Sequence, residues 1–487
     1  MTARAELGTL EATGLVQIAA LQPELEYLFR HALVQEAAYA TLLKQDRRTL
    51  HRAAADTILA LHPGREREFA GIVAMHFEQA GEPARAAEHL VTAGEHALER
   101  FANREASAFF SRAFELATPD DVNLRLRAAI GAANATWTIV ATGDEIDRLE
   151  AALDAGEGAD PRVLTDGYFW VAFLRRQRGE VPETSPRLRR ALERGAELGT
   201  TIQDPSAAAM PRALMGVYMA FTGQLRDGAR QMREALEVIE QKGDRVSVAI
   251  VSDFLAMTYA RLGEFDLAEA TIANSQRVAA GSDAIARVDL EIASASLALE
   301  RGLPSEACER AHECGERAEK LGAYACVVAA NMVYGAASLA REDATSARPP
   351  LERGSEICRV TSMAPLRTLT HALLGSARAR LGDVPGGVAS WDDALEGARA
   401  MGDRFGEAQT LWGRGRTYAS QKEWTTALPD IDRAVELFEE MEARPALARA
   451  LRDRAGVLRG LGHDEEAARD EKRSGELATQ LGLRDRI

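Results

Sequence analysis

The sequence predicts an all-α fold, a right-handed solenoid of antiparallel helical hairpins, because one spacing repeats along it. Glycines suited to end a helix recur about every 40 residues in the C-terminal two-thirds of the chain: Gly223, Gly263, Gly302, Gly382 and Gly462. We call these glycines the anchors of the repeats. At the two positions where the 40-residue spacing calls for a further anchor, the chain has Glu342 and Lys422. The residues seven before, five after and twelve after each anchor are always small. Three such columns over seven repeats indicate stacked structural units.

Each repeat is expected to contain two helices joined at the anchor. A glycine there suits the left-handed backbone conformation that commonly ends a helix. The small residues let the two helix axes approach to about 8–10 Å. In the repeat anchored at 422, the small columns hold Gly415, Ala427 and Ala434. Ile431 and Phe438 add apolar residues at helical spacing, so this segment predicts an amphipathic second helix.

The pattern of small and apolar residues resembles the tetratricopeptide repeat (TPR). Two repeats carry it best, and their matching residues are Ala256, Tyr259, Gly263, Ala268, Ile272 and Ser275, and Gly415, Tyr418, Ala427, Ile431 and Ala434. The family repeat has about 34 residues, so these units have longer helices, similar to those of maltose-regulator-type bacterial activators. A generic α-solenoid without TPR geometry is the alternative.

Three segments are expected along the chain. Residues 1–62 contain a helix ended by Gly14, two strands (Leu15–Ala19 and Glu26–Phe29) around a turn at 22–24, and a further helix. This order matches the back half of a winged-helix domain followed by a junction helix. Residues 63–160 read as N-terminal helical repeats, and residues 161–487 as the TPR-like solenoid.

Composition excludes several classes of function. Lys and Arg total 59 against 74 Asp and Glu, and the resulting net charge of −15 disfavours nucleic acid as a partner of the whole chain. No apolar run reaches about 18 residues and no signal peptide is evident, so we expect no membrane association and a cytoplasmic location. The four cysteines form no C-x-x-C pair, and no H-E-x-x-H motif occurs. The sequence therefore predicts no metal, no cofactor and no catalytic residues.

Residues 27–51, which include the run YLFRHALVQEAAY, resemble the winged-helix to repeat junction of bacterial signal-transduction ATPases with numerous domains (STAND). Among these proteins, the similarity is greatest to those joining an adenylate/guanylate cyclase, an AAA-type ATPase and TPRs. The resemblance implies that His31, at the start of a helix, contacts the nucleotide phosphate when an ATPase domain is present. No G-x-x-x-x-G-K-[ST] loop occurs in this sequence, so we expect no enzyme activity from it.

The leading functional prediction is a non-catalytic scaffold or sensor that binds a protein, a peptide or a small ligand in signal transduction. The alternative is the regulatory C-terminal part of an ATPase, an adenylate cyclase or a transcription activator. In TPRs the first helix of each hairpin lines the concave face, and counting back from the anchors gives its inward positions. The early inward residues are apolar: Phe169, Phe173, Met210, Val217 and Phe221. The late ones are basic or aromatic: Arg380, Trp412, Arg416, Arg449, Arg452 and Arg459. Guanidinium groups suit carboxylates and phosphates, so an acidic peptide or an anionic ligand is the expected occupant, against the alternative of a solvated face paired to local acids such as Asp453.

Overall fold

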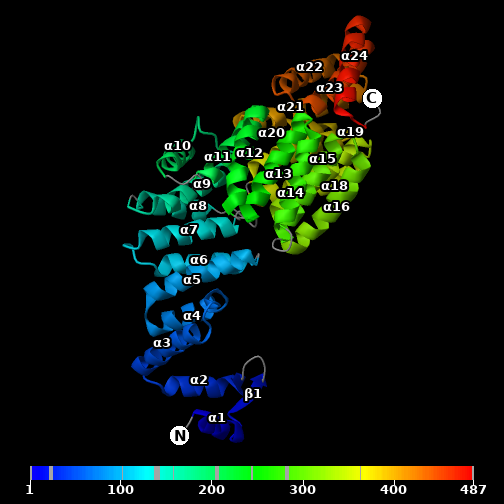
Figure 1. Ribbon diagram of the computed structural model, residues 1–487. Helices are drawn as coiled ribbons and strands as arrows, with labels where there is room; N and C mark the ends of the chain where they lie inside the picture. The colour runs from blue at the N-terminus through cyan, green and yellow to red at the C-terminus, as the bar shows by residue number, and fades with distance from the viewer. Residues whose placement is uncertain are drawn as a thin grey trace. The chain divides into compact units, whose positions relative to one another are not determined.

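The computed structural model describes residues 3–20, 26–100, 102–136, 143–156, 158–202, 208–242, 245–279, 284–361 and 363–484. Within these ranges the chain forms helices α1–α24 and one two-stranded hairpin (Figure 1). The all-α class and the hairpin solenoid predicted from the sequence are thus confirmed. The helices divide into two compact units, one of residues 1–93 and 112–118, the other of residues 94–111 and 119–487. The expected domain boundaries at 62 and 160 remain predictions.

The first unit contains the helix–hairpin–helix order expected at the N-terminus. Its elements are α1 (Ala3–Ala12), β1 (Val16–Ala20), β2 (Glu26–Phe29), α2 (Ala32–Thr41), α3 (Lys44–Leu61), α4 (Glu66–Ala80) and most of α5 (Pro83–Glu99). The strands pair antiparallel with Val16 opposite Phe29, and the turn predicted at 22–24 lies outside the described residues. Phe77 on α4 is fully buried in a core with Ala55, Val73 and Ala86. This core holds α3, α4 and α5 together.

The second unit is the long solenoid. Of helix α6 (Asn103–Leu116), residues 103–111 belong to this unit and residues 112–116 to the first unit. The helices after it alternate as first and second members of hairpins. They are α7 (Val122–Thr136), α8 (Gly143–Asp154), α9 (Pro161–Gln177), α10 (Pro186–Thr201), α11 (Ala209–Phe221), α12 (Leu225–Lys242), α13 (Arg245–Leu262), α14 (Phe265–Ala279), α15 (Ala284–Glu300), α16 (Pro304–Leu321), α17 (Tyr324–Ala340), α18 (Ala344–Thr361), α19 (Ala364–Arg380), α20 (Val384–Ala400), α21 (Arg404–Ser420), α22 (Trp424–Glu440), α23 (Arg444–Gly460) and α24 (Asp464–Leu481). From α9 onward, odd-numbered helices are the first helices of the hairpins and even-numbered ones the second.

The small residues seven before each anchor are the points of closest approach within a hairpin. A Cβ added to Gly375 would lie 2.5 Å from the ring of Trp391, and one added to Gly335 would lie 2.6 Å from Leu351. Each partner stands nine residues after its anchor, so a glycine column on the first helix faces a large buried residue on the second. The seven anchors also have the left-handed backbone that was expected, including the non-glycine anchors Glu342 (φ 63°) and Lys422 (φ 62°).

The early hairpins of the second unit pack against its late hairpins along a line that we call the seam. A Cβ at Gly179 would meet Ala364, one at Gly223 would meet Met441, and one at Gly263 would meet Leu481. The Cβ at Gly179 would also meet Met401, and the intervals from Gly179 to Met401, from Gly223 to Met441 and from Gly263 to Leu481 are 222, 218 and 218 residues. The solenoid therefore stacks on itself in a nearly constant register. One apolar cluster accordingly contains residues of α11–α15 together with residues of α20–α23. Figure 1 shows α20 and α21 near α12 and α13, in agreement with this cluster.

Arginines of α23 cap two early helices at the seam. The Nε of Arg444 donates to the carbonyl oxygen of Leu262 at 2.7 Å, at the C-terminus of α13. Arg449 donates to the carbonyl oxygens of Leu299 (3.3 Å) and Glu300 (2.6 Å) at the C-terminus of α15, and its Nη1 pairs with the Glu300 carboxylate at 3.0 Å. The last carbonyls of a helix have no partner within the helix, so a guanidinium group there satisfies them and complements the helix dipole.

Candidate functional site

Three of the predicted groove residues meet around one carboxylate on the first helices of the late repeats. The Nε of Arg416 lies 3.0 Å from Oδ2 of Asp453, and the indole Nε1 of Trp412 donates to the same oxygen at 2.9 Å. The Arg416 guanidinium also lies over the Trp412 ring, 5.2 Å from its centroid. Arg452 approaches Oδ1 of Asp453 at 3.8 Å. We call this cluster, together with the nearby Arg380, the arginine face.

The arginine face has more positive than negative charge. Arg380 on α19 donates from Nη1 to the carbonyl oxygen of Leu339 at 3.1 Å, while its buried Nε has no hydrogen-bond partner among the described residues. Burial, and then the nearby charge of Arg416, lower the pKa of Arg380. A guanidinium group that is both desolvated and repelled by its neighbour would be stabilised by an added anion. The face therefore has the chemistry of an anion site.

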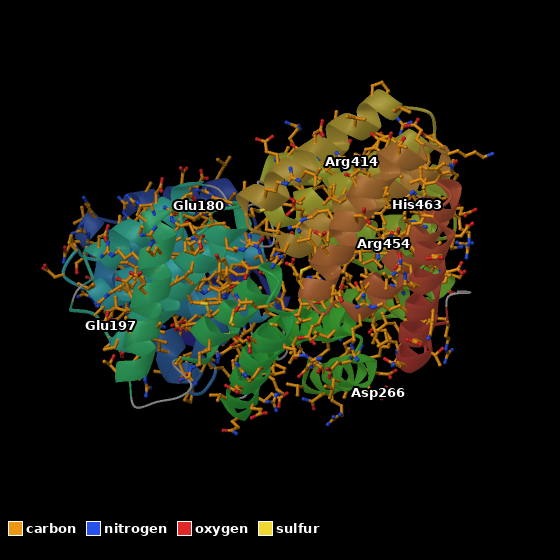
Figure 2. All side chains as sticks on the ribbon, turned by 90° about the horizontal axis from the view of Figure 1, so that it is seen from above. Glu180, Glu197, Asp266, Arg414, Arg454 and His463 are labelled. Carbon is orange, nitrogen blue, oxygen red and sulfur yellow. The ribbon has the colours of Figure 1, made fainter. Side chains whose placement is uncertain are left out.

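The other two predicted arginines lie elsewhere. Arg449 is used in the seam, where it caps α15. Arg459 pairs with Glu471 on α24, the second helix of the same hairpin. Two further pairs also join first and second helices: the guanidinium groups of Arg414 and Arg454 each form a bidentate pair, with Asp430 and Asp470, at distances of 2.6 and 2.8 Å. Figure 2 labels both arginines in the late repeats.

The apolar residues predicted for the early groove lie mostly in the core of the second unit. Val217 is buried, and Met210 and Phe221 pack against the apolar cluster that crosses the seam. Phe169 and Phe173 stack on one another on α9, with ring centroids 6.0 Å apart. Phe173 is buried, whereas Phe169 is half-buried and borders a cavity beside α10.

A buried group of charges at the seam was not predicted from the sequence. Arg176 on α9 and Arg261 on α13 lie near Asp403, which begins α21. Burial lowers the pKa of both arginines and raises that of Asp403. The Arg176 guanidinium lies 4.7 Å from the centroid of the Phe221 ring and makes no hydrogen bond within the described part of the chain. Oδ1 of Asp403 accepts the Gly406 N–H at 2.9 Å and so caps α21.

Ser355 on α18, His371 on α19 and Asp393 on α20 form a chain of polar contacts. The Oγ of Ser355 and the Nε2 of His371 form a hydrogen bond of 2.7 Å. Nδ1 of His371 lies 2.7 Å from Oδ2 of Asp393, close enough for an ion pair. Burial lowers the pKa of His371 despite this carboxylate. Ser355 is inside a helix, where its backbone N–H cannot stabilise an oxyanion, so we interpret the group as a polar contact between three helices.

His31 occupies the N-cap position of α2, is exposed, and makes no side-chain capping hydrogen bond. In the described ranges no three His, Cys, Asp or Glu side chains are grouped closely enough to hold a metal ion. The helices that the structure describes are all too short or too polar to cross a membrane.

No family model matches the sequence, and no curated protein matches it. Solved structures do resemble the fold. A Rap protein complexed with competence and sporulation factor is 14% identical, with a TM-score of 0.56, over 74% of this chain and 99% of the other. A STAND protein with a TPR sensor from Pyrococcus horikoshii is 15% identical, with a TM-score of 0.49, over 82% of this chain and 59% of the other. The Rap conjugation gene regulator of plasmid pLS20, in complex with the Phr* peptide, is 10% identical over 69% of this chain and 94% of the other, with a TM-score of 0.47.

The chain therefore has a TPR-like helical-repeat fold. At such identities a structural likeness shows the fold alone, so membership of the STAND ATPases remains a prediction.

Proposed function

We propose that the second unit is a non-catalytic binding module of a signalling protein and that its arginine face takes an acidic peptide or an acidic protein segment. The observation that carries this proposal is the group of guanidinium ions around the Asp453 carboxylate, with Trp412 beside them and Glu342 as the other acidic group that acts on Arg380. Arginine presents a planar array of donors that matches a carboxylate, and an indole ring supplies apolar contact area. The Rap protein of similar fold was solved with a bound factor, which is compatible with such a role.

The arrangement suits exchange of one carboxylate for another. Asp453 occupies the Trp412 and Arg416 donors without a ligand, so an incoming Glu or Asp side chain would share Arg416 and approach Arg380. The side chain of Arg416 is 31% exposed and can therefore reach a ligand. A ligand carboxylate would also relieve the repulsion between Arg416 and Arg380, and this gain would add to its affinity.

In a longer protein with an ATPase domain, the same module would serve as its sensor. The exposed His31 side chain, which caps no backbone group, would then be available to a nucleotide phosphate. This second role rests on the resemblance of residues 27–51 to the STAND junction.

A labelled hexaglutamate peptide tests the arginine face by fluorescence anisotropy. The double variant Arg416→Gln and Arg452→Gln should weaken binding at least about tenfold, because charge-assisted hydrogen bonds contribute about 1.5–3 kcal/mol each. It should also reduce the dependence of affinity on salt. The matched control is Arg359→Gln with Arg433→Gln, since both arginines make exposed pairs on second helices with Glu356 and Glu436. Equal loss of affinity in the two double variants would show that binding is non-specific and refute the proposed site.

A further inference from the structure

A cavity of about 190 Å³ lies between the hairpins α9–α10 and α11–α12. Of the five residues that helix α10 contributes to its lining, four are small and the fifth is Leu192; the small ones are Ala191, Gly195, Ala196 and Gly199. A Cβ placed on Gly195 would touch only Tyr168, at 3.7 Å, so the space above this glycine is open. A Cβ on Gly199 would lie 2.8 Å from that of Ala208, so the cavity closes at this end.

The remaining walls of the cavity are apolar and partly aromatic. Phe169 and Ala172 of α9 lie on one side, and Leu214 and Met215 of α11 lie on the other. An apolar cavity of about 150 Å³ engineered in another protein stays free of water and binds benzene. The cavity beside α10 is larger, so it has room for one aromatic ring with a short substituent. The half-buried ring of Phe169 offers an offset-stacked or edge-to-face contact to such a ring.

Two polar side chains, Arg212 of α11 and Gln231 of α12, complete the lining. Arg212 is exposed and forms no ion pair or side-chain hydrogen bond with any described residue. An unpaired guanidinium group beside an apolar cavity favours a ligand whose apolar body ends in an anion. A carboxylate matches the planar donors of arginine and can accept two of them.

We propose that the cavity beside α10 binds a small monoaromatic carboxylate, with the ring against Phe169, Leu214 and Met215 and the carboxylate on Arg212. This site is distinct from the arginine face, because it lies between α9, α10, α11 and α12 and not on α19, α21 and α23. It would give the solenoid a small-molecule input separate from its peptide site, and either proposal can fail without the other.

The probe is 4-fluorophenylacetate, whose binding is followed by fluorine NMR and by thermal shift. Gly195→Leu should fill the cavity and abolish saturable binding, while its melting temperature stays at or above that of Gly195→Ala. The alanine variant is the matched control, because it removes the glycine from the helix and leaves most of the space open. Binding retained by Gly195→Leu would overturn the proposal, and so would a leucine variant that melts below the alanine variant, since no cavity could then exist.

The anion contact is tested separately at the exposed Arg212, where a substitution does not disturb packing. Arg212→Gln should weaken the binding of 4-fluorophenylacetate at least about tenfold, because one charge-assisted pair is lost. The affinity for neutral 4-fluorotoluene should stay unchanged. Equal effects on the two probes would refute the role of Arg212. Failure of the native chain to bind either probe at millimolar concentration would refute the site as a whole.

Discussion

The glycine seven residues before an anchor should be intolerant even of alanine, and Gly375 gives the sharpest case. An added methyl group at Gly375 would lie 2.5 Å from Cδ1 and 2.6 Å from Nε1 of Trp391. Trp391 is fully buried, and its Nε1 donates to the carbonyl oxygen of Ala372 at 3.2 Å. Ordinary contact needs at least 3.4 Å, so the indole ring or the helix axis must move by about 1 Å.

The expected cost follows from three contributions. Overpacking of a core costs about 1–3 kcal/mol, and weakening of the indole hydrogen bond adds about 1 kcal/mol. Replacing a helical glycine by alanine contributes about 1 kcal/mol of stability in return. Gly375→Ala should therefore lower the free energy of unfolding of the second unit by about 1–3 kcal/mol. The same substitution at Gly456 on α23, where no atom lies within 4 Å of the added methyl group, should raise it by up to about 1 kcal/mol.

Urea unfolding followed by tryptophan fluorescence measures both variants. The five tryptophans of the chain stand at positions 137, 170, 391, 412 and 424, all within the second unit. The midpoints of Gly375→Ala and Gly456→Ala should move in opposite directions at unchanged slope. If Gly375→Ala proved as stable as Gly456→Ala, the small column would not mark the contact between helices, and the register of all seven hairpins would have to be redrawn.

Two further predictions concern stability. Arg449→Gln removes the cap of α15 at the seam and should lower the free energy of unfolding by about 2–3 kcal/mol. Arg433→Gln, which breaks an exposed ion pair with Glu436, should lower it by less than about 1 kcal/mol. Similar urea midpoints for the two variants would mean that the Arg449 contacts at the seam contribute no stability. Burial lowers the pKa of His371, so the folded second unit favours the neutral imidazole, and the stability present above the unfolded pKa of about 6.5 is lost as pH falls through and below that value. Urea midpoints at pH 7.5 and 5.5 should differ less in His371→Gln than in the native chain, and an unchanged difference would exclude His371 as its source.

The sequence alone determined the hairpins. Anchors such as Gly263 and Lys422 depend on local backbone conformation, and the small columns depend on the packing of two helices that are adjacent in the chain. Both signals lie within one repeat, so periodicity was sufficient to predict them. The polar character of the late first helices was also predicted from the sequence, and three of the six late residues named there do meet around Asp453.

Only the tertiary structure decided which of these residues belong to the arginine face and which to the seam. Arg449 and Arg452 stand three residues apart on one helix, yet Arg449 caps α15 from about 150 residues earlier in the chain, while Arg452 lies beside Asp453. The position of the seam depends on the small rotation between each hairpin and the next. These rotations accumulate over the whole second unit, so the sequence of one repeat is not sufficient to predict where distant hairpins meet. For the same reason, the buried group of Arg176, Arg261 and Asp403 has no local signal: its members come from α9, α13 and the start of α21 and meet only because the solenoid stacks on itself.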